Sequence, residues 1–476
     1  MQELMRKTMA EQAALIRNRE VAPIELVDAA IHEIERMNPA LNAVVIPMYE
    51  IAREAVGALR GDEAFSGVPM LLKDVIAEYA GAPLTEGSRY LEGYVSPQDS
   101  ELVRRYRNAG FIVCGKTNAP EFASEPTTEP DFYGPTHNPW DLGHSPGGSS
   151  GGSGAAVAAG MVSVAHANDG GGSTRVPAAC CGLVGLKTTR GRNPLGPDYG
   201  DLGGAGLISE HVVTRTVLDN ALMLDVTAGP DIGAPYYPPE PARPFANEVG
   251  ADPGCLRIAF SDQPVMDTPV HEDCRKAVRD IATLCESLGH HVEEARPVAD
   301  ASRYNENFTT LWLTMLGWMI RDWERRTGRP VSAECFERHT WKMYNVDAQR
   351  RPSDFLLALQ DMHRFAREVA PFFEDYDVWL TPTLTEPPPP LGWFKHDREH
   401  PRQATTRLEQ YPRFTSFANV TGQPALSLPL CWNDAGLPIG IQLTGRYADE
   451  ATLFRVAAQL EAARPWADRW PEVPTA

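Results

Sequence analysis

The residues with the clearest chemistry lie in Ser145–Arg175, a stretch that holds nine glycines and six serines. It is not a flexible linker, because it encloses a small-residue helix pattern at 153–160 and an apolar run at 161–167 of the length of a buried strand. That run ends in three glycines followed by Ser173, just before a short helix pattern. Backbone N–H groups left free at such a turn face one point, which predicts an oxyanion site beside a serine nucleophile.

Two other interpretations of this stretch are less favoured. Residues 147–151 read GGSSG and match G-x-S-x-G, the nucleophile elbow of α/β-hydrolases. That motif directly follows a strand, whereas the preceding residues, YGPTHNPWDLGHSP, cannot form one. A phosphate site would need a P-loop or a G-x-G-x-x-G pattern, and the stretch contains neither.

A lysine at the end of a predicted strand is the second candidate. The segment Gly67–Asp74 reads GVPMLLKD, an apolar strand that delivers Lys73 at its end, where α/β proteins usually place chemistry. Most lysines are solvated surface residues. One that closes a largely apolar run is more readily drawn inward.

Strand and helix patterns alternate along the chain without internal repeats. This alternation predicts an α/β fold, with one large domain over residues 1–476. Its central sheet is expected to be mixed and mostly parallel, with helices on both faces. We place the catalytic core within 65–195 and expect loops between Arg192 and a helix that starts at Thr214.

The totals exclude several classes of function. A net charge of −19 argues against nucleic acid or an anionic membrane as the main partner. No signal peptide and no apolar run of 18 residues is visible, so we expect a cytoplasmic protein without a membrane span. His396 and His400 have i, i+4 spacing but lie in a proline-flanked loop without a zinc motif, which favours solvated charges. We therefore expect no metal and no cofactor.

Five ordered motifs resemble the amidase signature family from about residue 10 to residue 463. Two are the family's hallmarks, a GGSSGGS loop and a D-x-GGS-x-R turn, and three further elements flank them. They stand here as Gly147–Ser153, Asp169–Arg175, Gly67–Asp74, Gly115–Asn118 and Gly422–Pro429. Five such elements in order make coincidence very improbable.

The resemblance implies a catalytic triad of Lys73, Ser149 and Ser173. Ser173 would be the nucleophile, and Ser149 a bridging serine that follows a cis peptide bond. The chemistry of the residues agrees, since a serine hydroxyl needs a base and no histidine stands in a motif that offers one. A lysine can serve when burial lowers its pKa.

The glycine turn supplies the remaining parts. The backbone N–H groups expected to hold the oxyanion are those of Gly170, Gly171, Gly172 and Ser173. Asp169 and Arg175 are expected to pair and brace the turn. Ser150 either donates a hydrogen bond that supports the site or caps the helix after it.

One residue departs from the family pattern. Gly170 stands where the family most often has threonine, and the AHANDGGGS context is similar to the branch that contains 6-aminohexanoate cyclic-dimer hydrolases. This resemblance implies a serine-dependent hydrolase of small linear or cyclic amides, with aryl amides, esters and carbamates as further substrate classes. We expect a monomer or homodimer. The alternative is the amidase-fold subunit of a glutamine-dependent tRNA amidotransferase, which would need partner subunits.

Pocket walls in this family come from variable segments, here expected at 120–135, 302–345 and 380–415. The second holds aromatic and methionine side chains at helical spacing, which can wall a substrate pocket or pack in the core. They are Trp312, Met315, Trp318, Met319 and Trp323.

Overall fold

The computed structural model describes residues 1–200, 205–395 and 401–474. Its strands form one 11-stranded sheet. They are β1 (Val44–Pro47), β2 (Pro69–Lys73), β3 (Ile112–Thr117), β4 (Val164–Asp169), β5 (Val184–Lys187), β6 (Ser209–Thr214), β7 (Arg257–Phe260), β8 (His291–Glu294), β9 (Val378–Pro382), β10 (Ala425–Trp432) and β11 (Pro438–Gly445).

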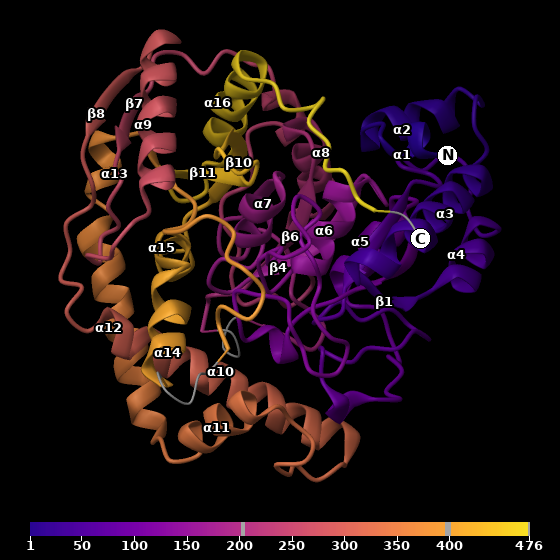
Figure 1. The fold of residues 1–476 in the computed structure, drawn as a ribbon, viewed down its shortest axis with the longest axis horizontal. Helices are drawn as coiled ribbons and strands as arrows, with labels where there is room; N and C mark the ends of the chain where they lie inside the picture. The colour runs from indigo at the N-terminus through magenta and orange to yellow at the C-terminus, as the bar shows by residue number, and fades with distance from the viewer. Residues whose placement is uncertain (201–204, 396–400, 475–476) are drawn as a thin grey trace.

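Helices cover the sheet along its whole length (Figure 1). Those that precede the glycine-rich stretch are α1 (Gln2–Met5), α2 (Met9–Arg17), α3 (Pro23–Leu41), α4 (Tyr49–Val56) and α5 (Glu101–Asn108). Those in and after it are α6 (Gly151–Ala159), α7 (Arg175–Cys181), α8 (Val217–Thr227), α9 (Glu272–Ser287), α10 (Tyr304–Thr327), α11 (Arg338–Asp347), α12 (Pro352–Val369), α13 (Phe372–Asp375), α14 (Pro401–Gln410), α15 (Arg413–Thr421) and α16 (Glu450–Ala463). In Figure 1, α10, α11 and α12 lie on the lower side, away from α1 to α4 on the right.

The sheet has the strand order β1-β3-β2-β4-β6-β5-β10-β11-β9-β7-β8. It is mixed, as predicted, but it is not mostly parallel. Within the described residues four strand pairings are parallel and six are antiparallel. Short connections explain part of the difference, because β10 and β11 form a hairpin and only antiparallel neighbours can be joined so directly.

Strand β6 corrects the expectation of loops after Arg192. Its sequence, SEHVVT, holds four polar residues and only two apolar ones, yet every residue is buried. The polar side chains are tolerated because they find partners inside, as Glu210 does with His166 and His211 with Asn220. A buried strand without an apolar run gives little signal in sequence.

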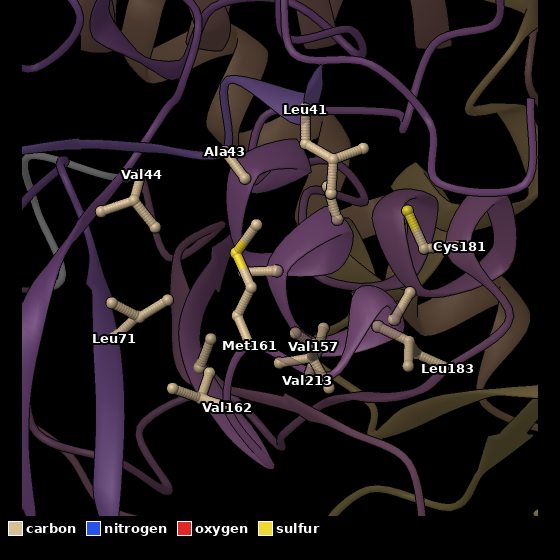
Figure 2. Packing of buried hydrophobic residues seen from close by; sticks show 14 of the residues in the cluster. Leu41, Ala43, Val44, Leu71, Val157, Met161, Val162, Cys181, Leu183 and Val213 are labelled. Carbon is tan, nitrogen blue, oxygen red and sulfur yellow. The ribbon is translucent and has the colours of Figure 1, made fainter. Parts of the chain in front are cut away.

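The core around α6 positions the glycine-rich stretch. Figure 2 shows Val157 of this helix and Met161, just after its end, among side chains of the neighbouring strands such as Leu71 and Val213. The small residues of α6 let it pack closely against the sheet and α7. The helix is therefore fixed beside the carboxyl end of β2.

Strand directions bring the candidate residues to one edge of the sheet. The parallel strands β2 and β4 end side by side at Lys73 and Asp169. Strand β6 runs antiparallel to β4, so that Asn168 and Glu210 are register partners at the same edge. The loop before α6 and the turn before α7 close over this edge.

Candidate active site

Lys73 and Ser149 meet inside the protein. Both residues are fully buried, and Nζ of Lys73 donates a hydrogen bond of 2.7 Å to Oγ of Ser149. The peptide bond between Gly148 and Ser149 is cis. A side chain at Gly148 would place its Cβ 2.4 Å from the carbonyl oxygen of Thr127, so only glycine fits there.

The surroundings of Lys73 favour its neutral form near pH 7. Burial lowers the pKa of Lys73 from its ordinary value of 10.5 to about 7, and the negative charges of Glu210 and Asp169 oppose this shift. Nζ also donates to Oδ1 of Asn168 at 2.5 Å. A lysine in this state can accept a proton from a neighbouring hydroxyl.

Ser173 lies in the turn between β4 and α7, where the site opens. The residue is 8% exposed and lines two spaces, a cavity of about 300 Å³ and a smaller chamber of about 30 Å³. Ser149 and Asn168 line the smaller one as well. The structure thus brings Ser149 and Ser173 to one chamber, although no hydrogen bond joins their hydroxyl groups among the described residues.

Ser150 supports the turn rather than capping α6. Its Oγ donates to the carbonyl oxygen of Asn168 at 3.3 Å, and its N–H donates to the carbonyl oxygen of Ser173 at the same distance. No side-chain capping bond forms at the start of α6. Of the two predicted roles, this geometry favours the supporting hydrogen-bond donor, and its part in catalysis stays a prediction.

The set of expected oxyanion donors needs one correction. The N–H of Gly172 donates to Oδ1 of Asp169 at 2.7 Å and is therefore already engaged. Gly172 has φ +138° and a Cβ there would lie 2.3 Å from Oγ1 of Thr415. Only glycine therefore fits the backbone conformation at this position. The N–H groups of Gly170, Gly171 and Ser173 have no partner among the described residues and remain as donors.

Asp169 and Arg175 form the predicted ion pair at the base of the turn. Nε and Nη2 of Arg175 each donate to one carboxylate oxygen at 2.9 Å, and both residues are buried. Although burial works in the opposite direction, the Arg175 guanidinium holds the pKa of Asp169 down to about 2. Asp169 is thus a charged acceptor for the turn's N–H groups.

Sequence reasoning missed two residues at this site. Asn168 contacts Lys73. Its signal in the sequence is that of a polar residue near the end of a buried strand, next to the turn that carries Ser173. Asn419 in α15 donates to the carbonyl oxygen and to Oδ1 of Asp169 at 2.9 and 2.8 Å. Its signal was weak, since a helical asparagine 250 residues away has no local reason to reach this turn.

We expect Asp169→Asn to lower the free energy of unfolding by about 3–5 kcal/mol, because it leaves the Arg175 charge buried without compensation. Urea unfolding would measure the loss. The matched control is Asp62→Asn, which breaks a pair exposed on both sides and should cost less than about 1 kcal/mol. Equal losses in the two variants would show that the buried pair has no special weight.

The larger cavity receives residues from all three segments named as expected pocket walls. Glu125, Phe308, Trp312, Met343 and Arg413 are among its lining residues. Trp312 faces both spaces, and its ring lies 3.4 Å from where a Cβ of Gly170 would stand. The wall nearest Ser173 is therefore aromatic.

The other side chains of the aromatic segment divide between wall and core. Met315 and Met319 line the small chamber, whereas Trp318 lines a separate surface groove. Trp323 is buried in the core beside Tyr94. Helical spacing alone did not separate these environments.

Two further expectations concern metals and membranes. Among residues 1–200, 205–395 and 401–474, no group of three or more His, Cys, Asp or Glu side chains is arranged to hold a metal ion. His396 and His400 lie outside the described residues. In the same described ranges no helix combines the length and the apolar character that a membrane crossing requires.

Comparisons with known proteins agree along nearly the whole chain. The family model described as Amidase matches residues 25–454. The 6-aminohexanoate-cyclic-dimer hydrolase of Paenarthrobacter ureafaciens is 38% identical over 473 residues, which cover 97% of this chain and 96% of that protein. These matches confirm the predicted family resemblance.

Solved structures give the same result. A 6-aminohexanoate cyclic dimer hydrolase complexed with substrate has a TM-score of 0.94 at 37% identity, with 98% of this chain and 99% of that chain covered. A bacterial aryl acylamidase of the amidase signature family has a TM-score of 0.88 at 26% identity, with 97% of both chains covered. The predicted large α/β domain is confirmed.

Proposed function

We propose, from the premise that this chain belongs to the amidase family and is a hydrolase acting on amide C–N bonds, that it works through an acyl-enzyme on Ser173. The observation that carries the proposal is the 2.7 Å hydrogen bond from Lys73 to Ser149. It joins a base with a pKa of about 7 to a hydroxyl that shares a chamber with Ser173. Such a base is well matched to catalysis near neutral pH.

The proposed reaction begins with a proton transfer. Neutral Lys73 accepts the hydroxyl proton of Ser149, and Ser149 in turn accepts the hydroxyl proton of Ser173. At the same time Oγ of Ser173 bonds to the amide carbon. The N–H groups of Gly170, Gly171 and Ser173 stabilise the oxyanion that forms. The C–N bond then breaks as the relayed proton passes to the leaving amine, and water hydrolyses the ester left on Ser173.

We propose small amides, linear or cyclic, as substrates. A relative of very similar structure is named for a cyclic dimer of 6-aminohexanoate, and the cavity of about 300 Å³ beside Ser173 has an apolar wall that suits a neutral body. Esters and carbamates follow the same acyl-enzyme chemistry. In this proposal the walls from 120–135, 302–345 and 380–415 determine the choice of substrate, and the chain works without a cofactor as a monomer or homodimer.

The test is the release of amine from a panel of aryl amides, aliphatic primary amides, small lactam oligomers, carbamates and glutamine. Wild type and Ser173→Ala are assayed side by side. We expect turnover of bulky amides or carbamates that depends on Ser173, with glutamine untouched. Turnover of glutamine alone, or silence until a partner is added, would favour the tRNA amidotransferase subunit instead.

We expect kcat/KM to rise with pH through about 7, because Lys73 must lose its proton to act as the base. Glu210→Gln removes a buried negative charge that favours the protonated lysine. The midpoint of this acid limb should therefore move to lower pH in that variant. A pH–rate profile measures the midpoint, and Glu33→Gln, a buried carboxylate on α3, should leave it in place. An unmoved midpoint in folded Glu210→Gln would contradict the assignment of Lys73.

A further inference from the structure

Arg413 presents an unsatisfied charge to the substrate cavity. It is the first residue of α15, lines the cavity and is only 5% exposed. Nη1 donates to Oδ1 of Asn305, while Nε is buried without a partner. Among the described residues the guanidinium forms no ion pair with a carboxylate. Glu409 on α14 also lines the cavity, but it is exposed to solvent.

The polar atoms that Arg413 and Asn305 leave free at this end of the cavity are hydrogen-bond donors. An arginine has donors only and stays charged, and the burial of Arg413 lowers its pKa without neutralising it. Because Oδ1 of Asn305 already accepts from Arg413, the amide NH₂ of Asn305 is the part left to a ligand. The Glu409 carboxylate favours this charge without forming an ion pair with it. A buried cation without a paired carboxylate is costly, so an incoming acceptor would relieve a penalty as well as form a bond.

The position of α15 ties this donor group to the reacting centre. Oγ1 of Thr415, two residues after Arg413, donates to the carbonyl oxygen of Gly171 at 2.7 Å. The start of the helix is thereby fixed against the turn that holds Ser173. The same cavity also has an apolar lining, with Phe308 and Trp312 from α10 and Leu408 from α14.

We infer that Arg413 binds a second oxygen acceptor of the substrate, a carboxylate or a carbonyl, at the end of the apolar body away from the amide that is cleaved. This inference rests on the proposed function and narrows its substrate class. The substrate has three parts: a scissile amide at Ser173, an apolar or aromatic spacer along α10, and an acceptor at Arg413. Loss of a hydrogen bond to a charged group corresponds to a drop of about tenfold or more in kcat/KM.

The experiment uses three amides with the same leaving amine and spacer, whose far ends are a carboxylate, its methyl ester and an alkyl group of similar size. Wild type, Arg413→Met and the control Lys276→Met are compared by kcat/KM; Lys276 is an exposed cation on α9 that does not line this cavity. We expect Arg413→Met to lose about tenfold or more on acceptor-bearing amides and less than about twofold on the alkyl amide. Lys276→Met should lose less than about twofold on all three. A greater loss on the carboxylate than on the ester identifies a charged acceptor. Equal losses on the carboxylate and the ester, with the alkyl amide little affected, identify a carbonyl.

Equal losses on all three amides, or no loss, would overturn the inference. Should Arg413→Met not fold, wild type alone decides, because it should prefer an acceptor-bearing amide to the alkyl amide by about tenfold or more. Ser173→Ala is assayed on the same amides. An inactive Ser173→Ala shows that the proposed nucleophile holds, whatever the result for Arg413. Activity in Ser173→Ala would instead contradict the proposed nucleophile.

Discussion

Ser173→Ala is expected to abolish amide hydrolysis while the protein stays folded. Removal of a serine nucleophile from such a catalytic unit lowers kcat by more than about 10⁴-fold, because no other group can form the acyl-enzyme. The cost in stability should be small, since the turn is held by other contacts. Asp169 accepts from the Gly172 N–H, and Ser150 donates to the Ser173 carbonyl oxygen. Both are unchanged by loss of Oγ.

Steady-state amine release and thermal unfolding of Ser173→Ala would check both halves of this expectation. Ser163→Ala is the matched control, as Ser163 is also buried but its hydroxyl donates to Gln12 far from the site. It should keep its activity. Turnover in Ser173→Ala comparable to wild type would refute the acyl-enzyme on this residue.

The residues that the sequence could predict are those whose signal is local. Lys73 ends an apolar strand and Ser173 follows three glycines, so strand direction and turn chemistry already point to them. The link of Ser149 to Lys73 came from the family motifs, and the structure shows their hydrogen bond.

The residues that the sequence could not predict act through contacts with residues far away in the chain. Asn419 holds Asp169 from 250 residues away, and Glu210 reaches His166 from a strand with no apolar run. Gly172 was assigned as an oxyanion donor because its N–H follows the right pattern. Only the position of the Asp169 carboxylate shows that this donor is engaged. Local pattern predicts which groups exist, whereas long-range packing decides which of them are free.

Lys73→Met is expected to be nearly inactive and more stable than wild type. Methionine fills similar space without an amine, so the proton acceptor is lost and kcat should fall by about 10²–10⁴-fold. Amine release and urea unfolding measure the two effects. The matched control is Lys187→Met, the same change at a buried lysine of β5 that donates to the Thr188 carbonyl and does not contact Ser149. It should keep activity within a few-fold.

The stability gain of Lys73→Met should depend on pH with a definite sign. In the unfolded chain this lysine stays protonated up to its ordinary pKa of 10.5, whereas the folded state releases the proton above about 7. Folding therefore carries a penalty, which is the burial of the charged ammonium below about 7 and the release of its proton between about 7 and 10.5. The penalty is complete below about 7 and vanishes above 10.5. The advantage of methionine should be largest in acid and should shrink as the pH rises. A gain that does not change with pH would mean that Lys73 keeps its proton in the folded protein, and an amine that keeps its proton cannot be the base.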